Sequence, residues 1–168
     1  LDSIAEDCTL CTSSTVIAEI DDFRAKVSNC LVSGTCPDNV PIGCWNTSEV
    51  TDMGFAFYNI VDFDDSINCW NVASVTDMNK MFRYATNFNQ PLDNWNVASV
   101  TDMTGVFLFA TNFNQPVDDW NVASVNNMRV MFSYATYFNQ PLDDWDVASV
   151  TNMNAMFRGA PDFNQCLS

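Results

Sequence analysis

The stretch WNVASVTDMNKMFRYATNFNQPLDN at residues 70–94 returns as WNVASVTDMTGVFLFATNFNQPVDD at residues 95–119, and the two agree at 18 of 25 positions. All five tryptophans of the chain keep the same period, at Trp45, Trp70, Trp95, Trp120 and Trp145. An unbroken period of this length predicts stacked coils, because one unit cannot bury its apolar side alone and its neighbours complete the core.

Other apolar positions recur in phase with the tryptophans. In residues 70–94 they are Val75, Met78, Phe82 and Phe88, and each has an identical counterpart in the other four repeats. We expect these columns to pack as a continuous core. A cofactor or glycan pocket lined by them is the weaker alternative.

Within one coil, the sequence predicts two short strands around a helical turn. Residues 100–103 carry a threonine between apolar ends, which favours a strand. A helical turn is indicated by apolar residues at offsets of three and four, at Met78, Met81, Phe82 and Ala85. A second strand at 88–92 must be brief, because Pro91 cannot donate a backbone hydrogen bond. The expected fold class is an α/β repeat with coils at 45–69, 70–94, 95–119, 120–144 and 145–168.

Residues 1–44 precede the repeats, and we expect them to form a helical N-terminal cap. Apolar residues follow helical spacing there, at Val16, Ile17, Ile20, Phe23 and Val27. The apolar stripe of this helix is predicted to cover the open end of the first coil, as repeat arrays require to stay soluble.

Five of the seven cysteines fall within this cap. The chain has no histidine and no pair of zinc knuckles, so disulfides and an oxidising compartment are favoured over zinc. Cys44 and Cys69 share a repeat position, and strands about 4.8 Å apart suit a disulfide, so we predict that these two pair. The cysteines Cys8, Cys11, Cys30 and Cys36 would then pair among themselves. Cys166 would remain free or bond to another chain.

The charge and residue inventory disfavour several functions. Twenty-one acidic residues against six basic ones give a net charge of -15, which repels nucleic acid and anionic membranes. No apolar stretch approaches the roughly 20 residues of a membrane-spanning helix, so we expect no membrane insertion. Without histidine, an activated nucleophile or a phosphate-binding loop, we expect no catalysis and no cofactor apart from the calcium ion considered below.

The unit W-x-V-A-S-V-T-x-M-x-x-M-F-x-x-A-x-x-F-N-Q-P-L-D resembles the repeat of the BspA-like leucine-rich surface proteins, a family that includes repeat arrays on mycoplasma lipoproteins. The resemblance covers residues 45–168 and leaves the cap outside. It implies a leucine-rich-repeat-like solenoid with a parallel ladder of short strands. It also implies adhesion or protein binding at a surface, and it supplies no catalytic residues.

Aspartates recur between coils and suggest a calcium site. They are Asp93, Asp118, Asp119, Asp143 and Asp144. Stacked carboxylates repel one another, and a bound Ca²⁺ would relieve that repulsion. The alternative is a hydrated acidic ridge.

An apolar substitution in the third coil suggests a partner-binding surface. Leu108 and Phe109 stand where the second coil has Arg83 and Tyr84. We predict that Tyr84, Leu108, Phe109 and Tyr134 form an exposed apolar patch that contacts a protein partner. The alternative is that they pack between coils.

Two further features concern the ends of the array. Asn46-Thr47-Ser48 is a glycosylation acceptor sequence, which applies if the protein passes through a secretory pathway. The coil at 145–168 shows no polar capping segment, so we expect it to be covered either by further protein or by a partner in a larger assembly.

These observations favour a secreted or cell-surface protein that serves as a non-catalytic structural and protein-binding module in adhesion or scaffolding. One alternative is an accessory subunit of a larger complex in an oxidising organelle lumen. Another is a solenoid that binds Ca²⁺ or a glycan.

Overall fold

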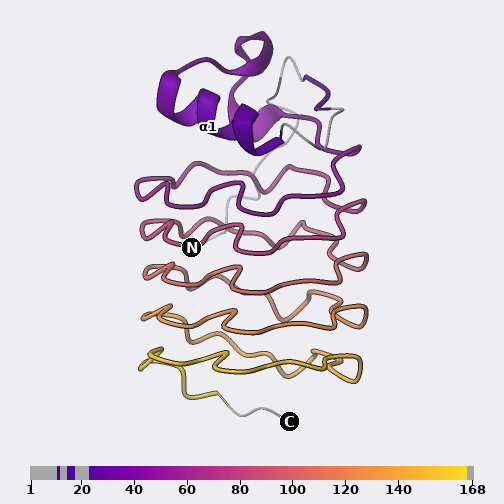
Figure 1. Ribbon diagram of the computed structural model, residues 1–168, viewed down its shortest axis with the longest axis vertical. Coiled ribbons are helices and arrows are strands. Elements are labelled where there is room, and N and C mark those ends of the chain that lie inside the picture. Colours follow the sequence, from indigo (N-terminus) through magenta and orange to yellow (C-terminus); the bar gives the residue numbers. More distant parts are fainter. Residues whose placement is uncertain (1–10, 12–14, 18–22, 166–168) are drawn as a thin grey trace, which may run out of the picture.

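The computed structural model describes residues 11, 15–17 and 23–165. The chain forms one stack, with a helical cap at one end and the repeats laid one upon another beneath it (Figure 1). The cap holds the α-helix α1 (Phe23–Ser33) and two short 3-10 helices, η3 (Pro37–Asn39) and η4 (Ile42–Cys44).

Neighbouring coils are joined by single parallel bridges instead of strands. The bridges connect Asp52 to Asp77, Asp77 to Asp102, Asp102 to Asn127, and Asn127 to Asn152. No strand forms anywhere in the described residues, and turns stand where the helical turns were expected. The prediction of short strands is therefore wrong, and the leucine-rich-repeat-like geometry implied by the resemblance stays a prediction.

The turn that follows each bridge explains this difference. Phe55 and Asn59 have left-handed φ values of 59° and 62°, and the equivalent two positions are left-handed in every later coil. Because left-handed residues recur within a turn of otherwise ordinary backbone conformation, every second N–H group points toward the next coil. Four such groups, on Met53, Phe55, Phe57 and Asn59, donate to carbonyls of the second coil at 2.8–2.9 Å. A strand would send these groups to both sides, and a helix would bond them internally.

The predicted apolar columns form the core. Val75, Met78, Phe82 and Phe88 are completely buried. The ring of Phe82 stacks on Phe57 and Phe107 of the adjacent coils, with centroids 5.1 and 5.5 Å away. Continuous ring stacks of this kind fix the register between coils, because a shifted coil would lose all of its ring contacts together.

Each later tryptophan also bonds to the backbone of an earlier part of the stack, 28 residues back in the sequence. The indole N–H of Trp70 donates to the carbonyl of Ile42 at 2.8 Å, and Trp95 donates to Ile67 at 3.1 Å. The same bond joins Trp120 to Leu92, and Trp145 to Val117. A buried indole needs such an acceptor, which explains why this position holds tryptophan and not another aromatic residue.

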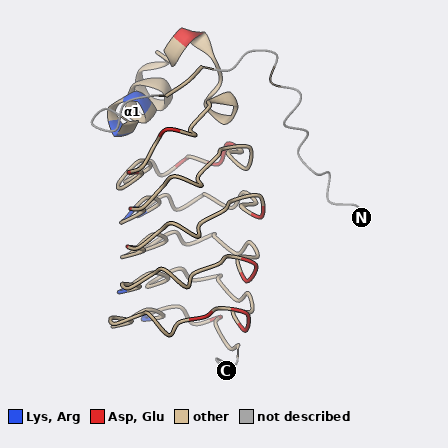
Figure 2. Cartoon of the chain, turned by 90° about the vertical axis from the view of Figure 1, so that its right-hand side faces the viewer, with Lys and Arg blue, Asp and Glu red and all other residues tan. Residues whose placement is uncertain are grey.

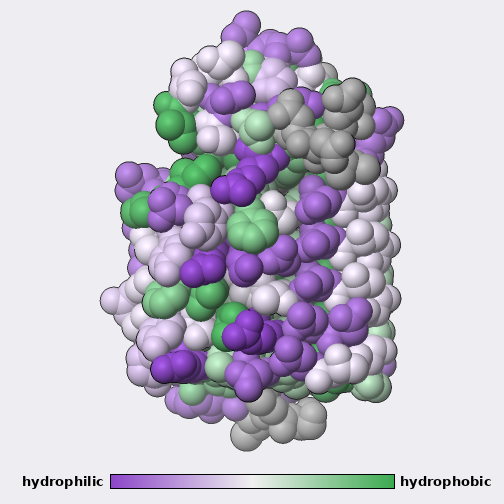
Figure 3. All heavy atoms as spheres, in the orientation of Figure 1, coloured by the Kyte–Doolittle hydropathy of each residue, from purple (hydrophilic) through white to green (hydrophobic). Residues whose placement is uncertain are grey.

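Polar side chains add a second set of bonds between coils. Asn89 accepts the backbone N–H of Asn114 at 2.9 Å, and Asn114 accepts that of Asn139 at the same distance. Hydrophilic residues accordingly run in columns along the face of the stack seen in Figure 3. These amides satisfy backbone groups where the proline-containing segment provides no regular ladder.

The cap covers the first coil through α1, and of the described residues in the predicted helix only those from Phe23 onward are helical. Phe23 lies edge-on to Trp45 and Trp70, at centroid distances of 6.3 and 5.5 Å. Val16 is not helical and forms a parallel bridge with Asn46. This extended segment satisfies the backbone of the first coil, because the N–H of Asn46 donates to Thr15 at 2.8 Å. Ile20 lies outside the described residues.

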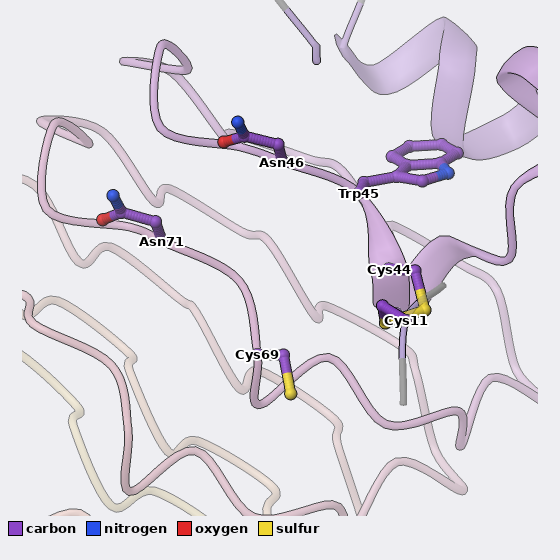
Figure 4. Close-up of a pocket in the computed structure, with 7 residues that line it drawn as sticks. Cys11, Cys44, Trp45, Asn46, Cys69 and Asn71 are labelled. Atoms are coloured by element: carbon purple, nitrogen blue, oxygen red, sulfur yellow. A yellow bond between two sulfur atoms is a disulfide. The ribbon is translucent and has the colours of Figure 1, made fainter. Parts of the chain in front are cut away.

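The disulfides differ from the predicted pairing. Cys44 bonds to Cys11, with a Cα separation of 5.5 Å, so the predicted Cys44–Cys69 disulfide is wrong. Cys44 ends the 3-10 helix η4, which takes it off the regular path of the coils and toward residue 11. Figure 4 shows Cys69 apart from this pair.

The remaining cysteines are only partly accounted for by the described residues. Cys30 bonds to Cys36, with a Cα separation of 4.1 Å, which is one of the pairings left open by the sequence. Cys69 is also disulfide-bonded. The predictions for Cys8 and Cys166 fall outside them too. The expectation that the four cap cysteines pair only among themselves is wrong, because Cys11 bonds to Cys44.

None of the helices in the described part of the chain is long and apolar enough to cross a membrane.

Candidate functional site

The turn of each coil places an aromatic ring at one edge of the stack. Tyr84, Phe109 and Tyr134 occupy the same repeat position, with left-handed φ values of 65°, 63° and 58°. Phe109 stacks on Tyr84 at 4.7 Å and on Tyr134 at 4.6 Å. Because the three residues share one backbone conformation, their rings leave the backbone in the same direction and lie parallel.

Two further rings continue this row onto the first coil. Tyr58 lies edge-on to Tyr84 at 6.1 Å, and Phe55 lies edge-on to Tyr58 at 5.7 Å. We call the five residues the aromatic edge: Phe55, Tyr58, Tyr84, Phe109 and Tyr134. The repeat pattern does not indicate Phe55 and Tyr58, because they occupy different repeat positions from the other three.

The aromatic edge is partly open to solvent. Tyr134 is 37% exposed, and the other four rings are half-buried. The structure thus places three of the predicted partner-binding residues in one accessible row. The fourth, Leu108, is buried at 9% exposure, so its prediction as a surface contact is wrong. A Cβ on Gly105 would lie 3.4 Å from that side chain, which packs into the turn of its own coil.

Three basic side chains lie against the first rings of this edge. The Lys80 ammonium is 4.9 Å from the centre of the Phe55 ring, and the Arg24 guanidinium is 5.4 Å from it. The Arg83 guanidinium is 5.6 Å from Tyr58 and 4.9 Å from Tyr84. We call Arg24, Lys80 and Arg83 the cation cluster. Arg24 comes from α1 and the other two from the second coil, so the cluster forms only where the cap meets the array.

The acidic residues in the described part of the chain do not neutralise these cations. None of the three has a carboxylate within 4.0 Å of its charged nitrogens among the described residues. In Figure 2 the Lys and Arg of the coils lie along one edge, while Asp and Glu gather mainly at the other. The fold therefore separates the two signs of charge.

The predicted calcium site is not formed. Of its five aspartates, Asp118 is half-buried and the rest are exposed. Asp93 instead accepts a hydrogen bond from the side chain of Asn68 at 2.9 Å. The part of the chain that the structure describes contains no group of three or more side chains that could hold a metal ion. Exposed carboxylates remain hydrated and screened, so their mutual repulsion needs no bound ion.

A second acidic column lies at the bridges between coils. Asp52, Asp77 and Asp102 each accept the backbone N–H two residues further on at 2.7 Å, and asparagine takes this place in the last two coils. Burial raises the pKa of the Asp77 carboxyl, as do the neighbouring charges of Asp52 and Asp102, against the opposing effect of the Asn79 N–H. The side chains of this column therefore have a structural role, because they accept hydrogen bonds from the backbone of their own turns.

The predicted glycosylation site lies beside an open hollow of about 270 Å³ near the Cys11–Cys44 disulfide (Figure 4). Asn46 is half-buried, and its side-chain oxygen accepts the N–H of Ser48 at 3.1 Å. Asn71 repeats this turn in the next coil by accepting the N–H of Ala73. The turn is thus a feature of the repeat, and glycosylation of Asn46 stays a prediction.

The outer face of the last coil lacks the cover that the other coils have. Met153 is 41% exposed, whereas Met53, Met78, Met103 and Met128 are completely buried. The N–H groups of Met153, Ala155 and Phe157 have no acceptor among the described residues, although the equivalent groups of each earlier coil are bonded.

Sequence comparison places the array in a known group of proteins. The family described as "Mycoplasma protein of unknown function, DUF285" matches residues 29–124 and 93–168. These two matches span the end of the cap and all five coils. No curated protein and no solved structure matches the chain.

Proposed function

This chain belongs to the family of Mycoplasma proteins of unknown function DUF285, and we propose that it is a non-catalytic protein-binding module that acts at a cell surface, in adhesion or scaffolding. The resemblance of its repeat to that of the BspA-like surface proteins supports this role. The Cys11–Cys44 and Cys30–Cys36 disulfides support a secreted or surface location, since such bonds persist in oxidising environments.

The observation that carries the proposal is the accessible row of rings at the aromatic edge. Tyrosine and tryptophan dominate protein interfaces because they bury a large area with few rotatable bonds and keep a polar group at the rim. Here Tyr84, Phe109 and Tyr134 are already held in parallel by their neighbours. A partner would therefore gain contact with them at a small cost in side-chain ordering.

The test is adhesion of protein-coated beads to cells or matrix, with aromatic-edge and control variants. Replacing both Phe109 and Tyr134 by Ser should abolish most of the binding. Tyr137→Asn is the matched control, because Tyr137 is 53% exposed, lies outside the aromatic edge, and aligns with asparagine in the second and third coils. Equal binding by the wild type and the Phe109/Tyr134 variant would refute the role of the aromatic edge.

A second candidate function is that of a subunit in a larger assembly, and the open face of the last coil favours it. The N–H groups there have no acceptor among the described residues, so they are available to carbonyl groups of further repeats or of a partner. A second copy is a poor partner, because a symmetric contact would set donors against donors and the opposite end of the array lies under α1. Further repeats of the same chain, or a different chain that presents backbone carbonyls, would fit this face.

A further inference from the structure

We propose that the cation cluster of Arg24, Lys80 and Arg83 is a carboxylate-binding site, and that the partner docks there through an acidic peptide segment. The inference rests on the proposed protein-binding function and adds the chemistry of the partner. It is carried by three cations that converge on the rings of Phe55, Tyr58 and Tyr84 and that form no ion pair within the described residues.

The position of these cations is unusual for this chain. Twenty-one acidic residues accompany only six basic ones, yet the described residues provide none of the three with an ion pair. Half of the basic residues instead gather around adjacent rings, where like charges repel one another. The ring faces offset part of that repulsion through cation–π attraction. A bound anion would remove the rest.

The donors present suit carboxylates. The Arg83 guanidinium lies over the Tyr84 ring, and its Nη2 donates a hydrogen bond to the Tyr84 hydroxyl at 3.4 Å. Its Nε is buried and has no hydrogen-bond partner. A guanidinium offers paired donors that match the two oxygens of a carboxylate, and the Lys80 ammonium adds a point charge beside it. The three cations come from α1 and the second coil and contact different rings, so they fit several neighbouring carboxylates better than one isolated anion.

The negative charge of the rest of the surface favours binding of a short acidic peptide over binding of a long polyanion. A net charge of -15 repels a nucleic acid over many phosphates, whereas a short segment meets mainly the local positive field. The aromatic edge continues from the cluster over Phe109 to Tyr134, which provides an apolar surface for side chains that follow the acidic ones.

The test is binding of a fluorescein-labelled hexaglutamate peptide that ends in two phenylalanines, measured by fluorescence anisotropy. The Lys80→Gln/Arg83→Gln variant should bind at least about tenfold more weakly than wild type. The matched control is Arg129→Gln/Arg158→Gln, which removes the same charge from later coils outside the cluster, and it should change the Kd by less than about twofold. Arg158 occupies the repeat position of Arg83, and Arg129 lies one position before that of Lys80. Thermal melting of both variants verifies that they fold.

Three results would overturn the inference. The first is the absence of peptide binding, and the second is an equal loss in the two double variants, which would indicate only a general charge effect. The third is tighter binding of heparin with the same variant dependence, which would assign the cluster to a sulfated glycan. The proposed function fails separately, if bead adhesion does not depend on Phe109 and Tyr134 whatever the peptide does.

Discussion

The ring of Tyr134 lies directly over the backbone of Gly159, so closely that a Cβ on that glycine would come within 2.5 Å of ring atoms Cδ1 and Cε1. Gly159 stands at the repeat position that Tyr84, Phe109 and Tyr134 occupy in the preceding coils. In those coils the rings stack on one another, whereas Tyr134 has no ring beneath it and covers the glycine instead. Gly159 therefore ends the aromatic edge.

Replacing Gly159 with alanine should destabilise the protein by about 2 kcal/mol. The backbone there has φ of 69°, where a side chain costs roughly 1 kcal/mol, and the new methyl group must also displace Tyr134. Gly34→Ala is the matched control, because its φ of 68° is the same but no atom lies within 4 Å of the added Cβ. Urea unfolding of both variants measures the difference. Equal losses would show that Tyr134 moves aside freely.

Replacing Asp77 with asparagine should stabilise the protein at neutral pH, by roughly 0.5 kcal/mol. The fold raises the pKa of this carboxyl, so the folded state binds its proton more readily than the unfolded chain does. Stability from this group is present at low pH and is lost as the pH rises through the folded pKa. Asparagine removes the charge and keeps the oxygen that accepts the Asn79 N–H, as Asn127 and Asn152 show in the same column.

The pH dependence of unfolding checks this explanation. The gain of Asp77→Asn over wild type should be present at pH 7 and should shrink below about pH 4, where the carboxyl is protonated in both states. Asp77→Ala should destabilise at both pH values because it also removes the acceptor of the Asn79 N–H. A gain that did not change with pH would rule out the charge of Asp77 as its cause.

The repeat and its core were predictable because a period of 25 residues aligns identical apolar side chains. The neighbours of Phe82 and Trp95 in the core are the equivalent residues of the adjacent repeats, and both side chains are buried as expected. Strands and helical turns were predicted wrongly inside the coil because the backbone at Lys80 and Tyr84 is left-handed. Non-glycine residues rarely adopt that conformation, and no side-chain pattern here signals it.

The site was predictable only where it follows the repeat. Tyr84, Phe109 and Tyr134 share one position and were identified together. Arg24 was missed because it reaches Phe55 and Tyr58 from α1, and a contact between the cap and the array has no periodic signal. The Cys11–Cys44 disulfide was missed for the same reason.

Removing the Cys11–Cys44 disulfide should cost more stability than removing Cys30–Cys36. The first bond spans 33 residues and the second only 6, so the first restricts the unfolded chain more. Chain entropy gives about 4 kcal/mol for the longer loop and about 2 kcal/mol for the shorter. Paired Cys→Ser variants, unfolded in urea, measure the two losses. A larger loss for the Cys30–Cys36 variant would show that the cap depends on the local geometry of α1 and η3 more than on loop closure.

Met153 should tolerate a charge that Met103 cannot, although both occupy the same repeat position. Met103 is completely buried between two coils, so Met103→Lys should cost at least about 3 kcal/mol or prevent folding. Met153 is 41% exposed on the last coil, and Met153→Lys should change stability by less than about 0.5 kcal/mol. Urea unfolding of the isolated protein measures both effects.

The same substitution tests whether the last coil docks onto another chain. Light scattering after size exclusion gives the native mass of the protein taken from its source. If a partner covers Met153 and the N–H groups beside it, the wild type should elute well above the mass of its single chain, and Met153→Lys should elute near that mass. Because the variant keeps its stability, a lower mass would report lost contact and not unfolding. A wild type that already elutes at its own mass would refute a stable assembly through this face and would leave the aromatic edge as the surface on which to seek the partner.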